Sequence, residues 1–340
     1  MKALWALAFC ALLAREGSAE LRSTLSLQHD DNLFETRHSK RQGWVNRLFI
    51  EMAEELVVRN WGRVYWRHQS GFKRLWQARE RGGLAGEVMA NHVALGGALR
   101  LGEQWTAIWQ TDGKLVNAQN LSHEQSYLRG GLRATVERRL GAAAHIGAHY
   151  GVGRDDMRDL DAADVTTREV GVGGRYGYGR FKGRLSLTWR RLAVDREIVG
   201  FAGVSKWRDR MLEGQWGVRY YRRALVDLNY TLLQNRSNAA ANRFRAHRLQ
   251  FLLAGALVAK IDGQIYWTLQ QRRYEELAIL APRAVADDEY AQNLLSLKMS
   301  RPLSEHYGLS VQWWHARNGS RQTAAFYRKN TLSLLLDMAL

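Results

Sequence analysis

The chain has 340 residues, of which 46% are hydrophobic, and its 50 Lys and Arg against 33 Asp and Glu give a formal net charge of +17. This composition is that of a folded protein and excludes a disordered chain. No window approaches the about 18 consecutive apolar residues of a membrane-spanning helix, so a helical membrane protein is excluded as well.

The N-terminal segment MKALWALAFCALLAREGSA, residues 1–19, has the order of a secretory signal peptide. Lys2 precedes an apolar run, and the small residues Gly17 and Ala19 stand where cleavage is expected. We expect residues 1–19 to be this signal and residues 20–340 to form a single domain; the alternative is a short buried helix. An exported protein is not expected to meet nucleic acid, so its positive charge indicates lipid phosphate, an anionic solute or an anionic polymer.

Apolar and polar residues alternate with a period of two along the chain, which predicts β-strands. In RFKGRLSLTWR, residues 180–190, Phe181, Leu185 and Leu187 alternate with basic and polar residues. Segments with the same pattern contain, in chain order, LRSTLSLQH near the start and then Leu128, Val170, Leu212, Val226, Leu249, Ile265, Leu295, Tyr307 and Leu332. Only two prolines occur, Pro282 and Pro302, which suits long uninterrupted ladders.

The links between these segments alternate in length. Short links fall near Asn60, Gly102, Gly141, Gly179, Arg223, Asp262 and Ser304, and longer polar links near 31–43, 73–83, 117–123, 154–166, 196–205, 236–242, 276–287 and 318–324. This alternation is typical of an outer-membrane barrel. It predicts an all-β, antiparallel transmembrane β-barrel of about 16 strands, between about 14 and 18, with both termini on the periplasmic, short-turn side.

The end of the sequence, FYRKNTLSLLLDMAL, has its leucines on one parity, at Leu332, Leu334 and Leu336. In a closed barrel this last strand would pair with LRSTLSLQH, and the apolar parity would face lipid. The alternative is a soluble, exported β-sandwich or propeller, whose strands also alternate.

If the apolar parity faces lipid, the basic residues of the opposite parity line the lumen, because an arginine on the lipid face costs roughly 2 to 4 kcal/mol near the midplane. The predicted lumen-facing, anion-facing residues are Arg63, Arg67, Arg129, Arg133, Arg175, Lys182, Arg184, Arg190, Arg219, Arg248, Arg272 and Lys298. Fewer acidic residues share that parity: Glu137, Glu169, Glu213, Asp227 and Asp337. Basic rings in an aqueous lumen favour anions. The alternative is that these charges pair across strands and stiffen the wall.

Catalytic and metal-binding signatures are absent from the sequence. The clusters to consider are Asp155 with Asp156, Asp287 with Asp288, and His145 with His149. The acidic pairs are expected in long loops, where calcium, ions that bridge lipopolysaccharide or solvent would meet them. We expect no enzyme, no cofactor and no metal; the alternative is a surface hydrolase that uses His145 or Asp155.

Two short motifs carry a family resemblance: DDNLF after the first strand and FYRKNTLSLLL in the last. The chain resembles a diffuse family of bacterial outer-membrane porins found with exopolysaccharide-secretion and surface-lipoprotein-assembly systems. The resemblance implies insertion by the barrel-assembly machinery and contact with outer-membrane lipid and lipopolysaccharide. It departs at Ala339 and Leu340, where such barrels commonly end on an aromatic residue.

The sequence therefore predicts a Gram-negative outer-membrane porin with a basic, anion-selective lumen. It would pass anionic solutes by passive or gated transport, or export an anionic polymer such as a polysaccharide. The alternative is a barrel plugged by its long loops, with a role in adhesion, assembly or structure.

Overall fold

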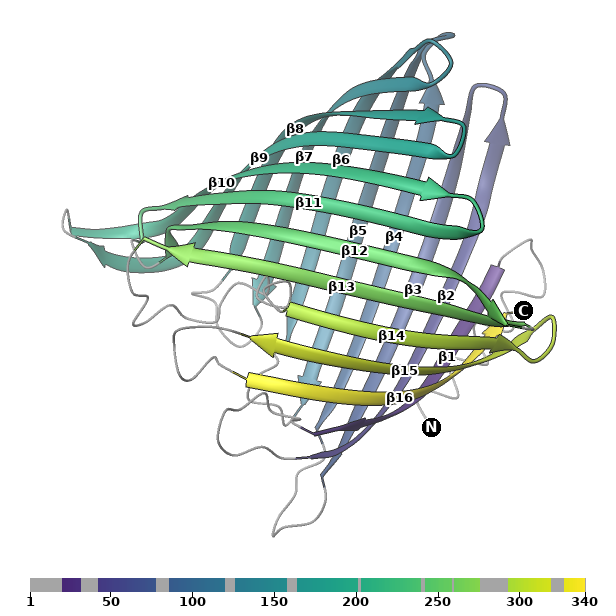
Figure 1. Cartoon of the computed structure of the whole chain (residues 1–340). Coiled ribbons are helices and arrows are strands. Elements are labelled where there is room, and N and C mark those ends of the chain that lie inside the picture. Colours follow the sequence, from purple (N-terminus) through teal and green to yellow (C-terminus); the bar gives the residue numbers. More distant parts are fainter. Residues whose placement is uncertain are drawn as a thin grey trace.

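A computed structural model describes residues 20–31, 42–77, 86–119, 126–157, 164–200, 203–239, 242–258, 260–275, 293–318 and 327–339. These residues form sixteen antiparallel β-strands and no α-helix, which confirms the predicted fold class (Figure 1). Nothing among them is a helix long and apolar enough to cross a membrane. The expected signal peptide, residues 1–19, lies outside the described residues.

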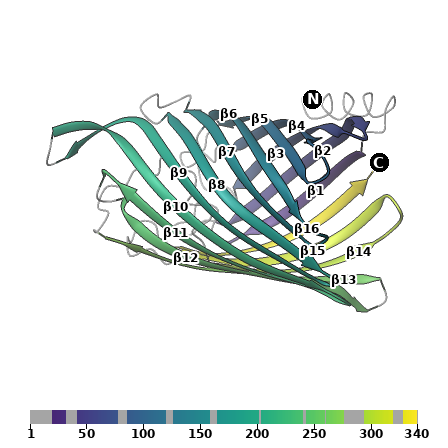
Figure 2. The same ribbon diagram turned by 90° about the horizontal axis from the view of Figure 1, so that it is seen from above.

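Each strand pairs with its neighbours in sequence, and the first pairs with the last, so the sheet closes. The strands are β1 (Glu20–Asp30), β2 (Gly43–Arg59), β3 (Gly62–Gln77), β4 (Glu87–Arg100), β5 (Trp105–Gln119), β6 (Tyr127–Leu140), β7 (Ala144–Met157), β8 (Val165–Tyr178), β9 (Phe181–Gly200), β10 (Gly203–Tyr221), β11 (Ala224–Ser237), β12 (Phe244–Val258), β13 (Ile261–Tyr274), β14 (Asn293–Pro302), β15 (Tyr307–Asn318) and β16 (Tyr327–Ala339). Figure 2 shows their common tilt as the sheet curves round.

One end of the barrel carries the tight turns. Gly102, Gly141 and Gly179 take positive φ values of 125°, 70° and 56° there, a backbone region that glycine enters without strain. The β12–β13 turn instead places Lys260 at a φ of 67°. The first residue of β1 and the last residue of β16 lie at this same end, because an even number of strands returns the chain to its starting side.

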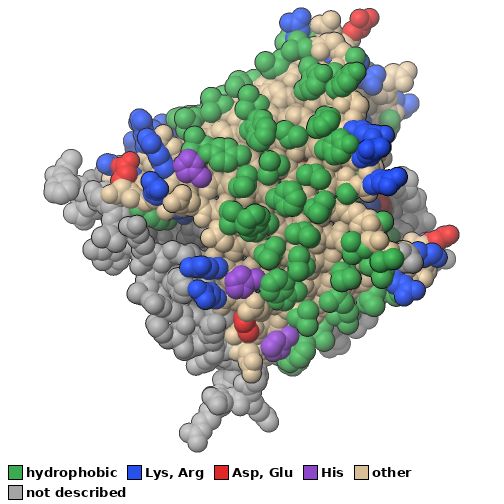
Figure 3. Space-filling model, in the orientation of Figure 1, with side chains coloured by type: hydrophobic (Ala, Val, Ile, Leu, Met, Phe, Trp, Pro, Cys, Tyr) green, Lys and Arg blue, Asp and Glu red, His purple; other side chains and the backbone are tan. Residues whose placement is uncertain are grey.

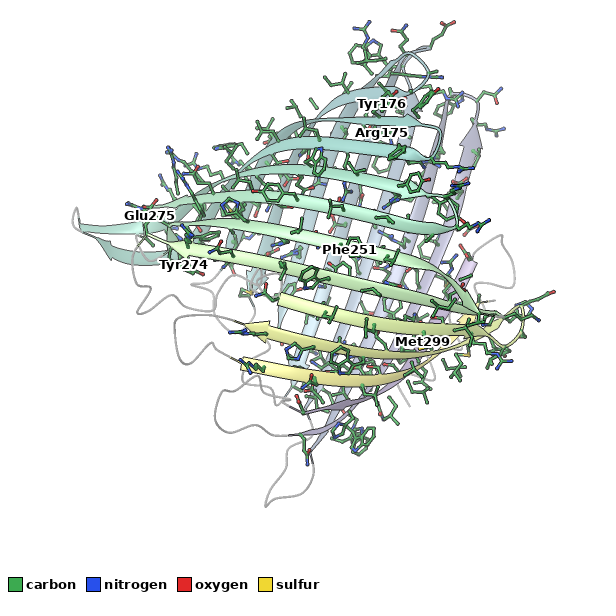
Figure 4. All side chains as sticks on the ribbon, in the orientation of Figure 1. Arg175, Tyr176, Phe251, Tyr274, Glu275 and Met299 are labelled. Carbon is green, nitrogen blue, oxygen red and sulfur yellow. The ribbon has the colours of Figure 1, made fainter. Side chains whose placement is uncertain are left out.

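The two parities of each strand have separated onto the two faces of the sheet. Leu185, Leu187 and Trp189 of β9 are 63%, 49% and 41% exposed. Hydrophobic side chains cover the visible outer face, and Lys and Arg gather at its two rims (Figure 3). Figure 4 places Phe251 in the middle of this face and Met299 nearer the short-turn end. A wide apolar band between polar rims is the outer surface of a protein that is solvated by lipid.

The seam between β1 and β16 is closed by more than backbone pairing. The C-terminal leucines lie in register with β1, where Leu336 faces Leu25 and Leu334 faces Leu27. On the other parity Lys329 Nζ lies 2.8 Å from Asp30 Oδ2, and both side chains are at most 10% exposed. The last strand is therefore paired on both edges, as the sequence predicted.

The expected loop at 196–205 is wrong. The β9–β10 ladder continues to Gly200 and Gly203, and only residues 201–202 lie between the strands. The ladder contains an irregularity between Lys206 and Arg208. The end of this hairpin extends beyond the neighbouring strands. The two strands pair there without presenting an apolar face to lipid, so the period-two pattern of the other strands is lost.

We expect Lys329→Met to destabilise the barrel, because Asp30 would keep a buried charge without this counter-ion. The expected loss is about 3 kcal/mol, measured as a lower urea midpoint of the barrel in detergent micelles. Lys206→Met is the matched control: its nitrogen also lies 2.8 Å from a carboxylate, that of Asp195, but both side chains are at least half exposed. The control is expected to show no measurable change. Equal midpoints for the two variants would contradict a stabilising role for the seam pair.

Candidate functional site

The inner face of the barrel carries the predicted cations. Strand register places all twelve predicted cations on the parity opposite the exposed hydrophobic residues. The same face holds small polar side chains that are almost fully buried, such as Ser333 at 1% and Ser310 at 2% exposed. The candidate site is therefore a lining formed by many strands.

A carboxylate bridged by two arginines stands at the centre of one wall. Glu169 of β8 pairs with Arg133 of β6 and, at 3.2 Å, with Arg190 of β9. Its side chain is 9% exposed. The bridge depends on Gly151 of β7, where an added Cβ would lie 2.9 Å from the Glu169 Cγ and Oε1 atoms. Because glycine leaves this space, the carboxylate lies against the wall between both cations.

A second pair corrects the expected position of Asp155. This residue belongs to β7 and not to a long loop, and it accepts two hydrogen bonds from Arg129, at 2.6 and 2.7 Å. His145 stands near the opposite end of the same strand, about 30 Å away at the rise of an extended chain. These two candidate residues of a hydrolase therefore do not meet. Asp287 and Asp288 lie outside the described residues.

Four cations on three neighbouring strands form what we call the lumen cation cluster: Arg175 of β8, Lys182 and Arg184 of β9, and Arg219 of β10. Arg175 lies directly opposite Arg184 in the ladder, and Lys182 lies directly opposite Arg219. Like charges in directly opposed positions destabilise a sheet, so this arrangement needs compensation.

Compensation for the lumen cation cluster comes from its two flanks. Glu137 of β6 accepts a hydrogen bond from Arg175 at 2.7 Å, and Asp227 of β11 accepts one from Arg219 at 2.7 Å. Arg184 donates to the neutral amide oxygen of Asn229, at 2.6 and 3.1 Å. Lys182 is exposed and has no ion pair among the described residues. Two carboxylates therefore balance four cations, and the cluster keeps an excess of positive charge.

The remaining predicted cations differ in their partners. Arg63 lies 3.5 Å from Glu55, Arg248 donates to Gln270, and Arg272 lies over the ring of Phe244. Arg67 and Lys298 have no ion pair in the part of the chain that the structure describes. The pairing alternative thus holds for Arg63, Arg129, Arg133, Arg175, Arg190 and Arg219, about half of the predicted set.

Two features of the lining were missed in the sequence. Asn229 orients Arg184 and donates to Asp227 at 2.6 Å, but an amide in a polar parity gives no distinctive signal. The second is an inward apolar cluster at the long-loop end, formed by Val165, Leu192, Val194, Trp207 and Met211. These residues are apolar although the inner parity is polar elsewhere, because the strands extend there beyond the lipid-facing band. Within the described ranges no group of three or more His, Cys, Asp or Glu could hold a metal ion.

Comparison with known proteins gives structural neighbours alone. No family model and no curated protein matches the chain. Similar solved structures include a bacterial polysaccharide outer membrane secretin, at 11% identity and a TM-score of 0.47, covering 95% of this chain and 97% of that one. Pseudomonas aeruginosa OccK8 (OprE) is 8% identical with a TM-score of 0.49 and covers 95% and 97%. Acinetobacter baumannii OccAB3 is 9% identical with a TM-score of 0.48 and covers 95% and 98%.

This chain and these solved structures are identical at about one residue in ten, so we argue the function from the lining of this barrel.

We expect Gly217→Val to displace Arg184 from Asn229. A Cβ at Gly217 would overlap Asn229 Oδ1 and lie 2.8 Å from Arg184 Nε. Overpacking of this kind costs about 1 to 3 kcal/mol, measured as a lower urea midpoint. Gly214→Val on the same strand is the control, because a Cβ there meets nothing within 4 Å. Comparable losses in both variants would show that β10 resists any side chain and that the Arg184 contact is not the cause.

Proposed function

We propose that the protein is an outer-membrane pore whose basic lumen passes anionic solutes or an anionic polymer. The observation that carries the proposal is the lumen cation cluster, Arg175, Lys182, Arg184 and Arg219, with which only Glu137 and Asp227 form ion pairs among the described residues. A mobile anion that passes along β8 to β10 would meet an excess of positive charge on a stiff wall. Rings of cations in a water-filled pore favour anions in this way.

The apolar outer band supports the location in an outer membrane, since a closed barrel leaves no strand edge without hydrogen bonds in lipid. The tight turns and both strand termini share one end, which we assign to the periplasm, and the long links then face outward. In this setting the barrel-assembly machinery inserts the chain and outer-membrane lipid surrounds it. We infer no catalytic role, because Asp155 is held by Arg129 and lies far from His145.

We expect stepwise anion-selective current from the folded barrel in a planar bilayer. The variant Lys182→Gln/Arg184→Gln should shift the reversal potential in a salt gradient toward zero, with about a threefold lower anion preference, because it removes the two cations of the cluster that lack a carboxylate partner.

The matched control is Arg191→Gln/Arg210→Gln, which removes two charges from the outer face of β9 and β10. It should conduct with unchanged selectivity. Equal shifts of the reversal potential in both variants would show that selectivity follows the overall charge. An unchanged reversal potential in the lumen variant would overturn the role of the cluster.

A plugged barrel is the second candidate, and one observation favours it. Trp207 and Val194 are 2% and 1% exposed on the inner face at the long-loop end, so protein groups cover that part of the inner wall. A plugged barrel would serve adhesion, assembly or structure. Absence of current from a correctly folded barrel would decide for this function and against the pore.

A further inference from the structure

The outer face carries a row of arginines in strict cross-strand register. Arg168 of β8 lies opposite Arg191 of β9, which lies opposite Arg210 of β10, which lies opposite Arg236 of β11. All four side chains are exposed. They share the parity of the lipid-facing residues, and we call them the outer arginine ladder. Adjacent strands are about 4.8 Å apart, so the ladder spans about 14 Å.

Within the part of the chain that the structure describes, the outer arginine ladder has no compensating protein group. Among the described residues, none of its four guanidinium groups makes an ion pair, a hydrogen bond or a contact with an aromatic face. This differs from the inner wall, where Glu137 and Asp227 flank the cations. Three directly opposed like-charged pairs oppose sheet formation unless an anion binds across them.

The ladder stands at the boundary of the apolar band. On β8, β9 and β10, the residues two positions nearer the tight turns on the same face are Val170, Trp189 and Leu212, which are 47%, 41% and 43% exposed; on β11 this position is Gln234. Val170 and Leu212 both pair with Trp189, so this last lipid-facing row runs parallel to the ladder. The arginines therefore lie where acyl chains end and lipid headgroups begin.

The basic surface continues onto the next strands. Arg245 of β12 lies opposite Arg273 of β13, and Arg245 also lies opposite Gln234 of β11, two residues from Arg236. A surface hollow of about 430 Å³ at this place is lined by Arg245, His247, Gln271, Arg273, Tyr274 and Glu275. Figure 3 shows Lys and Arg side chains gathered at this rim, and Figure 4 labels Tyr274 and Glu275 there.

We propose that the outer arginine ladder binds the phosphates of lipid headgroups in the leaflet on the long-loop side, and that its preferred ligand carries two phosphates. Guanidinium groups pair with phosphate oxygens in charge-assisted, bidentate hydrogen bonds. A row about 14 Å long can hold two separated phosphates of one lipid. The proposal rests on the membrane location proposed above, but not on whether the lumen conducts.

The test measures lipid binding to the folded barrel in non-ionic detergent by native mass spectrometry. The probes are bisphosphorylated lipid A and the same lipid without its phosphates. We expect the wild type to hold the phosphorylated lipid and to bind the dephosphorylated lipid at least tenfold more weakly. The variant R168Q/R191Q/R210Q/R236Q should lose at least tenfold in affinity for the phosphorylated lipid.

The matched control is R59Q/R100Q/R222Q/R223Q, which removes four exposed arginines from the short-turn end. It should bind lipid as the wild type does, and both variants should remain heat-modifiable barrels. Equal binding of the phosphorylated lipid by the ladder variant and the control would overturn the proposal. Equal affinity of the wild type for the phosphorylated and the dephosphorylated lipid would overturn it as well. Displacement of the lipid by a soluble anionic polysaccharide at lower concentration would assign the ladder to a polymer and also overturn it. A barrel that binds the lipid but carries no current would contradict the proposed pore and leave the lipid-binding proposal unaffected.

Discussion

Closure of the sheet between β1 and β16 is the constraint on which the rest of the molecule depends. A strand edge in hydrocarbon would leave backbone N–H and C=O groups without partners, at a cost of several kcal/mol for each group. Closure removes that edge and gives every strand two neighbours. It also divides the molecule into one inner and one outer surface, so successive residues of a strand face the inside and the outside of the barrel in turn.

The arginines of the inner and the outer surface differ in their partners. On the inner face, arginines pair with carboxylates and amides, and glycines at positions such as 151 and 217 let these side chains lie along the wall. On the outer face, the arginines of the ladder have no such partners among the described residues. A cation can remain uncompensated by protein where another molecule supplies the anion. This contrast links the proposed pore and the proposed lipid contact to one physical cause.

The inner lining is also uneven along its length. The lumen cation cluster lies toward the tight turns, Glu169 holds the middle of the wall, and the apolar cluster around Trp207 lies toward the long links. A solute entering from the long-loop side would pass a buried apolar region before it met the cations. In the proposed pore, selectivity and access would therefore be set at different levels of the barrel, so substitutions in one region should leave the other unchanged.

The sequence by itself determined the fold class and the approximate number of strands, because a strand repeats every two residues and a barrel alternates short and long links. It did not determine the length of the β9–β10 hairpin, since strands outside the membrane need no apolar parity. Only the tertiary structure decided which charges meet. Arg129 with Asp155, Arg184 with Asn229 and the outer arginine ladder depend on the register between strands. A shift of two residues in that register keeps every side chain on its face but changes every partner, and so the alternation pattern carries no information about it.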